Sequence, residues 1–102
     1  MNTLEIELGE DAESKRNTLK NFIGRVVIVQ HPKYGKIRGK VESLAEDQFD
    51  IRKPSNDTLA LLYEKIYTLS YERITELAIA NPTQADYIDE GRRNILKSNH
   101  AS

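Results

Sequence analysis

The stretch from residue 24 to residue 80 consists of short strand-like segments with little sequence between them. Val26 to Val29 is a β-branched run that is apolar on both sides, which is the pattern of a strand covered on both faces. From Lys36 to Leu44 apolar and charged residues alternate, which predicts a strand with one buried and one solvated face. Strands this short and this closely joined cannot form a flat isolated sheet without exposing an apolar face. The pattern therefore favours a small, strongly bent barrel.

Turn signals separate these segments. His31 to Gly35 is predicted to be the first turn, because Pro32 has no N–H for a strand ladder and Gly35 accepts a positive φ. The remaining strands are expected at Gln48 to Lys53, Leu59 to Leu69 and Arg73 to Ile79. The fold class predicted is mainly β, with five strands in an SH3-like barrel.

The N-terminal region precedes this barrel. With 102 residues, the chain has room for one domain with a modest core. Residues 4 to 8 alternate between apolar and acidic, which fits either a short strand or a frayed arm. A helix is predicted over about residues 12 to 23, with Asp11 as its N-cap and Gly24 at its end. We assign the arm and helix to residues 1–23, the barrel to about 24–80, and a C-terminal helix and tail to 81–102.

The C-terminal helix has a clear start and a thin apolar face. Thr83 and Asp86 have capping-box spacing at its predicted N-terminus. Its apolar residues are few, Ile88 with Ile95 and Leu96, so we expect a peripheral or partner-facing helix.

Basic residues gather in one part of the chain. Between Ser14 and Val41 there are eight Lys or Arg residues and no Asp or Glu, although the whole chain has a net charge of -1. That overall charge argues against a protein that coats nucleic acid through bulk charge. A local basic surface indicates an anionic partner such as RNA.

No spacing in the sequence indicates a catalytic or metal site. There is no cysteine, which excludes disulfides, thiolate zinc ligands and a cysteine nucleophile. His31 has only His100 as a second imidazole, and Asp86, Asp89 and Glu90 stand where the helix macrodipole favours acids. We expect a non-enzymatic protein that uses no metal or cofactor.

The sequence also indicates where the protein works. Its longest apolar runs, such as residues 26–29 and 59–63, are far too short to cross a bilayer. The acidic start lacks the basic and then apolar pattern of a targeting segment. We expect no membrane association and a cytoplasmic location.

Two short motifs resemble those of a known family. In the first, Gly39 begins a strand that is expected to bend, Val41 and Leu44 follow, and Phe49-Asp50-Ile51 closes the motif. This order is similar to the first motif of the Sm and Sm-like (Hfq-like) family, with one extra residue in the turn. In the second, Leu69-Ser70-Tyr71 precedes Ile74 and Leu77, which keep that family's apolar spacing.

The resemblance covers roughly residues 20 to 79. It implies an N-terminal helix, a strongly bent five-stranded barrel, a ring built by strand pairing between subunits, and RNA binding. A ring would also cover the long apolar strand from Leu59 to Leu69, which as a free edge would favour aggregation.

Three positions depart from the family pattern. Asp50 stands where the family usually has a base-contacting Asn, and Ser70 and Tyr71 replace an Arg-Gly pair. An ionised Asp only accepts hydrogen bonds and repels phosphate, and the missing Arg removes a stacking and phosphate-pairing group. We therefore place the RNA on the basic helix and strand face, with Tyr34 available to stack on a base. The candidate RNA-binding residues are Lys15, Arg16, Lys20, Lys33, Tyr34, Lys36, Arg38 and Lys40.

Two other interpretations stay open. A charged strand face is often only solvated, and the altered motif positions fit a structural or adaptor ring that binds protein instead of RNA. A competing resemblance is to the KOW motif of ribosomal and transcription-factor proteins, through residues 26–29, Lys33, Gly35, Gly39 and Val41. The glycines here are four apart, where that motif usually has three. It also implies RNA contact.

Overall fold

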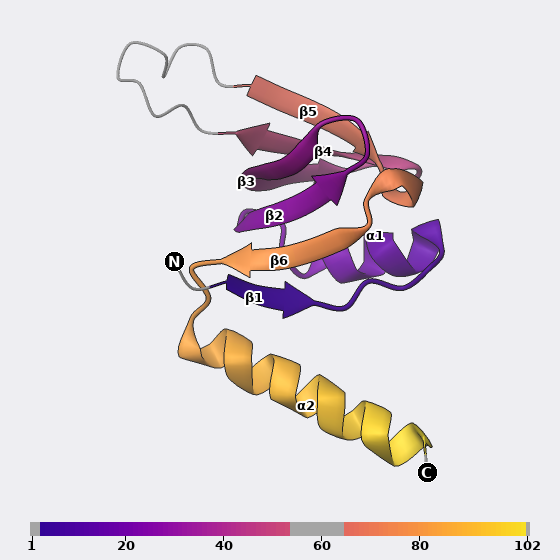
Figure 1. Ribbon diagram of the computed structural model, residues 1–102, viewed down its shortest axis with the longest axis vertical. Helices are drawn as coiled ribbons and strands as arrows, with labels where there is room; N and C mark the ends of the chain where they lie inside the picture. Colours follow the sequence, from indigo (N-terminus) through magenta and orange to yellow (C-terminus); the bar gives the residue numbers. More distant parts are fainter. Residues whose placement is uncertain (1–2, 54–64, 102) are drawn as a thin grey trace.

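The computed structural model describes residues 3–53 and 65–101, with side chains as far as residue 92 in the last helix. The elements follow one another as a short strand, a helix, four strands, a 3-10 turn, a strand and a long helix (Figure 1). They are β1 (Thr3–Ile6), α1 (Ala12–Lys20), β2 (Val26–His31), β3 (Gly35–Leu44), β4 (Gln48–Lys53), β5 (Lys65–Ser70), η2 (Tyr71–Arg73), β6 (Glu76–Ala80) and α2 (Gln84–Ala101).

The described strands form one antiparallel sheet in the order β1-β6-β2-β3-β4-β5. The mainly β class is confirmed, but the closed barrel of five strands is not. The described residues form six strands, because the N-terminal segment pairs with β6 from Thr3↔Ala80 to Ile6↔Leu77. The hydrogen-bonded sheet within the described ranges is open and ends at β1 and β5.

Most predicted strands have the expected positions. The strand from Gln48 to Lys53 is confirmed, and β3 begins at Gly35, one residue before the prediction. β5 starts at Lys65, and residues 59–64 of the predicted long strand lie outside the described ranges. The last strand starts at Glu76 instead of Arg73, because Arg73 belongs to η2 and the next two residues belong to neither element.

Helix α1 is shorter than the apolar spacing predicts. It ends at Lys20, and Asn21 is its C-cap. Phe22 is 3% exposed and packs in the core beyond the helix end, so its apolar character reflects burial and not helical structure. Gly24 follows with φ +83, a conformation that glycine adopts without strain.

Strand β3 bends between two partners. It pairs with β2 up to Val26↔Lys40 and with β4 from Lys40↔Arg52 onward, with a bulge after Val41. Its predicted alternation is confirmed, since Ile37, Gly39 and Val41 are buried and Lys36, Arg38 and Lys40 are exposed. One strand thus serves both halves of the sheet.

A single apolar core fills the bent sheet, with contributions from α1, η2 and all six strands. Tyr71 is fully buried at its centre, stacked on Phe49 with ring centroids 5.5 Å apart. Its hydroxyl donates to the Ala45 carbonyl at 2.6 Å. Burial raises the pKa of the Tyr71 hydroxyl.

Lys15 fastens α1 to η2. Its side chain is 8% exposed, and its Nζ donates to the carbonyls of Ile74 at 2.8 Å and Glu72 at 3.4 Å. The prediction that Lys15 lies on the exposed face of the helix is wrong. A buried ammonium requires hydrogen-bond acceptors, and carbonyls left free by the 3-10 turn and the chain after it supply them.

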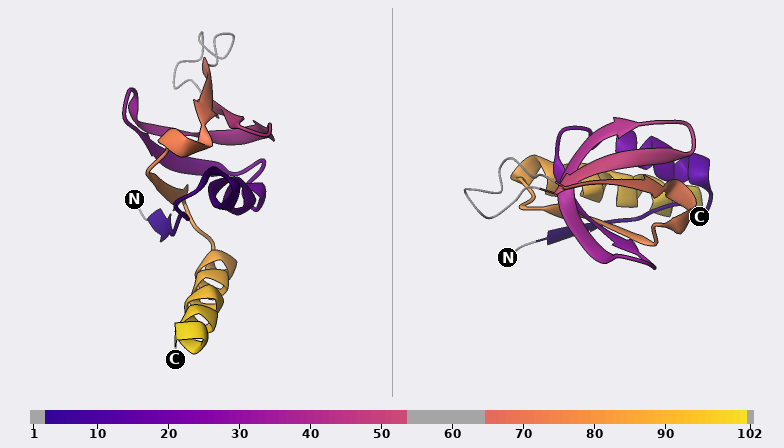
Figure 2. Two further views of the ribbon diagram at one scale, coloured as in Figure 1. Left: turned by 90° about the vertical axis from the view of Figure 1, so that its right-hand side faces the viewer. Right: turned by 90° about the horizontal axis from the view of Figure 1, so that it is seen from above.

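Helix α2 is attached to the body through its first turn. The predicted capping box is confirmed: the Thr83 N–H donates to Asp86 Oδ2 at 2.7 Å, and the Asp86 N–H donates to Thr83 Oγ1 at 3.3 Å. Both oxygens of Asp86 also accept from Arg25, at 2.6 Å each. Beyond this turn the helix runs away from the sheet (Figures 1 and 2).

We expect the Asp86→Asn substitution to destabilise the protein by about 1 to 2 kcal/mol at pH 7, a modest value because water reaches Arg25. Arg25 is 35% exposed in this pair, whereas Asp86 is 8% exposed. Hydrogen bonding from Arg25 lowers the pKa of Asp86 from 3.8, so the stabilisation is present above that pH and is lost as the pH falls below it. Urea unfolding at pH 7 and pH 3 measures this, with Glu13→Gln as a control. An equal loss at both pH values would contradict the role of the ion pair.

Candidate functional site

The β2–β3 turn presents a short loop of three residues, Pro32, Lys33 and Tyr34, between the paired residues His31 and Gly35. Gly35 has φ +72, as predicted for the end of this turn. The Lys33 N–H donates to His31 Nδ1 at 3.1 Å. The loop backbone is thereby held against a buried imidazole, which is 4% exposed.

Three aromatic rings run from this turn to β5. His31 and Tyr34 have ring centroids 5.0 Å apart, and Tyr34 meets Tyr67 of β5 edge to face at 5.2 Å. Tyr34 is 46% exposed, so its ring combines a fixed position with access to solvent. This contact also brings the turn against the strand at one end of the sheet order.

Two lysines lie over these rings. Lys33 Nζ is 5.3 Å from the Tyr34 centroid, and Lys65 Nζ is 5.5 Å from the Tyr67 centroid. Lys53 is paired directly with Lys65 in the β4–β5 register. Like charges opposite each other in a sheet are unfavourable, so these two lysines place positive charge side by side at a cost in stability. We call His31, Lys33, Tyr34, Lys65 and Tyr67 the cation–aromatic cluster.

Positive charge also acts on the buried imidazole. Burial lowers the pKa of His31 below its usual 6.5, and the charges of Arg73 and Lys33 lower it further. His31 therefore stays neutral under the Tyr34 ring at neutral pH, with Nδ1 accepting and Nε2 carrying the proton.

We expect folding stability to fall as the pH is lowered from 8 to 5.5. The unfolded chain takes up the His31 proton first, because its pKa is higher there than in the folded protein. Thermal unfolding across this range measures the slope. His31→Asn keeps an acceptor for the Lys33 N–H and should flatten it, whereas His100→Gln should not. A slope unchanged in His31→Asn would contradict the assignment.

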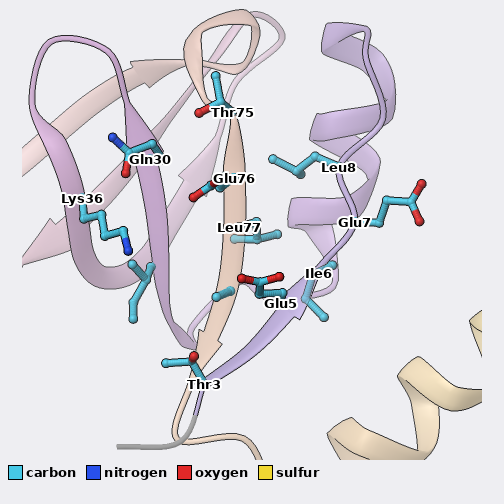
Figure 3. Close-up of a pocket in the computed structure, with 12 residues that line it drawn as sticks. Thr3, Glu5, Ile6, Glu7, Leu8, Gln30, Lys36, Thr75, Glu76 and Leu77 are labelled. Atoms are coloured by element: carbon cyan, nitrogen blue, oxygen red, sulfur yellow. The ribbon is translucent and has the colours of Figure 1, made fainter.

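The predicted strand face has a mixed charge. Lys36, Arg38 and Lys40 are exposed on β3, as predicted. Lys36, however, lines a groove of about 400 Å³ together with Glu5, Glu7 and Glu76. Figure 3 shows Lys36 on one side of this groove, Glu76 and Glu5 across its middle, and Glu7 at its far rim. Carboxylates beside Lys36 make this part of the face a poor phosphate site.

The basic residues of α1 do not form a common exposed surface. Lys15 is buried, as described above, and Arg16 is half-buried beside the Tyr71 hydroxyl. Lys20 is exposed in the last turn of the helix. Only the last of these is freely accessible to a large anion.

The altered motif positions have structural roles. Asp50 accepts hydrogen bonds from Thr68 Oγ1 at 2.6 Å and Ser43 Oγ at 3.2 Å, which links three neighbouring strands. Ser70 is half-buried and precedes η2 as its N-cap residue. Tyr71 lies in the core. None of the three is placed as a free contact group for a base.

Sequence reasoning missed Lys53, Lys65 and Tyr67 as site residues. Tyr67 is partly buried against the core. The available signal was the alternation of Lys65 with Tyr67 at the start of β5, matched by Lys33 beside Tyr34 in the turn. Nothing in the sequence alone places these two pairs together.

In residues 3–53 and 65–92 no three His, Asp or Glu side chains gather as a metal site requires. No helix in the described part of the chain is both long and apolar enough to cross a membrane. Comparison with family models, with curated proteins and with solved structures found no match to this chain.

Proposed function

We propose that this chain is a small Sm-like RNA-binding protein that holds single-stranded RNA at the cation–aromatic cluster. The observation that carries the proposal is the exposed Tyr34 ring, braced by His31 and Tyr67, with Lys33 and Lys65 over the two tyrosines. Proteins that bind single strands combine stacking rings with nearby cations in this way.

Each part of the cluster has a defined task. An RNA base stacks on Tyr34, and the flexible ammonium of Lys33 moves from the ring to the adjoining phosphate. Lys65 and Lys53 contact further phosphates along β5 and β4. Because stacking is available to any base, this site favours single strands over duplexes and shows little sequence preference.

Fluorescence anisotropy with a short labelled RNA of mixed sequence tests the proposal. We expect binding at low salt that weakens steeply with ionic strength, and much weaker binding to duplex RNA. The absence of any binding at low salt would overturn it.

The Sm-like proposal includes self-association through strand edges. In the described residues the sheet order ends at β1 and β5, so these are the strands through which copies would pair. β1 already covers the outer edge of β6 within the same chain. Light scattering after size exclusion should show more than two copies per particle, and a strict monomer at tens of micromolar would exclude a ring.

A protein-binding adaptor is the second candidate function. It is favoured by the groove that Lys36 lines together with Glu5 and Glu76. Ile28 and Ala78 lie among its apolar lining, and Glu5 and Glu76 among its carboxylates, which suits a basic peptide better than a nucleic acid. Parallel pull-downs with RNA and with protein from the native source separate the two candidates. Retention of protein alone, lost on Glu76→Lys and kept on Tyr34→Ala, would favour the adaptor.

A further inference from the structure

Helix α2 is the longest of the described elements, and its ion pair with the body lies in its first turn. It has 18 residues and is anchored through Asp86 and Arg25 in its first turn. From there it extends away from the sheet, as Figure 1 and the left view of Figure 2 show. Most of a helix's stability in a protein comes from packing of its apolar face, so packing of the projecting part would stabilise α2.

The projecting part exposes an apolar stripe. Tyr87 and Ile88 are 47% and 49% exposed. Gly91, one turn on from Ile88, has open space around the position of a Cβ atom, so another backbone can come close there. By spacing, Ile95 shares the helix face of Ile88.

The charges of α2 are arranged in opposite halves. Its acids, Asp86, Asp89 and Glu90, precede Gly91, and its bases, Arg92, Arg93 and Lys97, follow it. Because Asp86 is already paired with Arg25, a second copy of α2 running the opposite way places Asp89 and Glu90 against the bases that follow Gly91. A parallel copy would place like charges together, and the helix macrodipoles also favour the antiparallel arrangement.

We propose that α2 is a self-association site, at which two copies of this chain pair their helices antiparallel, centred on Gly91 and Arg92. In that register Ile88 of each copy faces Ile95 of the other, and Asp89 lies near Arg92 of the other. Both Asp89 and Arg92 are exposed. The α2 contact has twofold symmetry, so by itself it joins two copies and does not propagate.

Introduced cysteines test the direction of pairing, because the chain has none of its own. The proposed register brings residue 84 of one copy to residue 99 of the other. We expect a mixture of Gln84→Cys and Asn99→Cys chains to form a disulfide dimer under oxidised glutathione, and neither variant alone to do so. Cross-linking of each variant with itself would indicate parallel helices, and no cross-linking at all would exclude pairing; either result overturns the proposal.

Charge variants test the contact itself by sedimentation. Ile88→Glu should weaken dimerisation by roughly 30-fold or more, as loss of a central anchor does. Ile23→Glu is the matched control, since Ile23 is 52% exposed outside α2. The Asp89→Arg chain and the Arg92→Asp chain should each be monomeric at α2 when alone. A mixture of the two chains should pair, because each restores the opposite charge that the other needs. A folding defect would not produce this recovery. Equal dimerisation of wild type and Ile88→Glu would overturn the proposal.

These results do not depend on the proposed function. Ile88→Glu leaves the cation–aromatic cluster intact and should bind RNA without pairing through α2. A Tyr34→Ala chain should still pair through α2. Loss of one property without the other therefore shows which inference has failed.

Discussion

Replacing Tyr34 with Ala should reduce affinity for single-stranded RNA by about tenfold or more, the largest functional effect we expect of any single substitution. Loss of one stacking ring typically removes about 1 to 3 kcal/mol of binding free energy. Tyr34 has 46% of its surface exposed, so its removal opens no core cavity and should leave the fold stable. Anisotropy titrations at several salt concentrations measure the affinity and its salt slope.

Matched variants separate stacking from charge at this site. Tyr34→Phe keeps the ring and should retain most of the affinity. Lys33→Gln should lower the salt slope by about one phosphate contact, whereas Lys20→Gln, an exposed lysine on α1, should change it little. If Tyr34→Ala binds as wild type does, the base-stacking site is not at this turn.

The basic face of β3 is the alternative location for the RNA. Substitution of Lys36, Arg38 and Lys40 together by Gln should weaken RNA binding less than Tyr34→Ala does. Lys36 shares its groove with Glu5 and Glu76, which already offset its charge. A larger loss in the triple variant would place the RNA on β3, as the sequence alone predicts.

The features of this fold that the sequence predicts correctly are local ones. The alternation in β3, the glycine turn at Gly35 and the capping box of Thr83 and Asp86 all depend on residues a few positions apart. Backbone geometry and side-chain period determine such features directly. Each of them appears in the structure at its predicted residues.

The features that the sequence did not predict depend on contacts between residues far apart in the chain. Lys15 is buried because it reaches a carbonyl 59 residues away, and Arg25 pairs with an acid 61 residues away. Two members of the acid-free basic block are therefore structural. Tyr67 joins Tyr34 only because the bent sheet brings β5 to the β2–β3 turn. The spacing of apolar and charged residues along the chain does not predict these contacts.

Strands β3 and β4 approach closely at Gly39, and replacement of this glycine by Val should cause the largest loss of stability. A Cβ at this position would lie 2.6 Å from the Arg52 carbonyl oxygen and 3.0 Å from its carbon. These are backbone atoms of the paired strand β4, so they cannot turn aside as a flexible side chain does. We expect Gly39→Val to cost about 3 kcal/mol or more, a large part of the stability of a small domain.

Urea unfolding of Gly39→Val, Gly39→Ala and Lys40→Val measures this dependence. Lys40 is the next residue on the same strand, but it faces solvent, so a β-branched side chain there should be tolerated. The loss should grow from Ala to Val at position 39, because the added volume meets the same carbonyl. If Gly39→Val unfolds at the same urea concentration as Lys40→Val, the two strands do not approach closely there. The curvature that brings β5 to the β2–β3 turn, and with it the cation–aromatic cluster, would then require another cause.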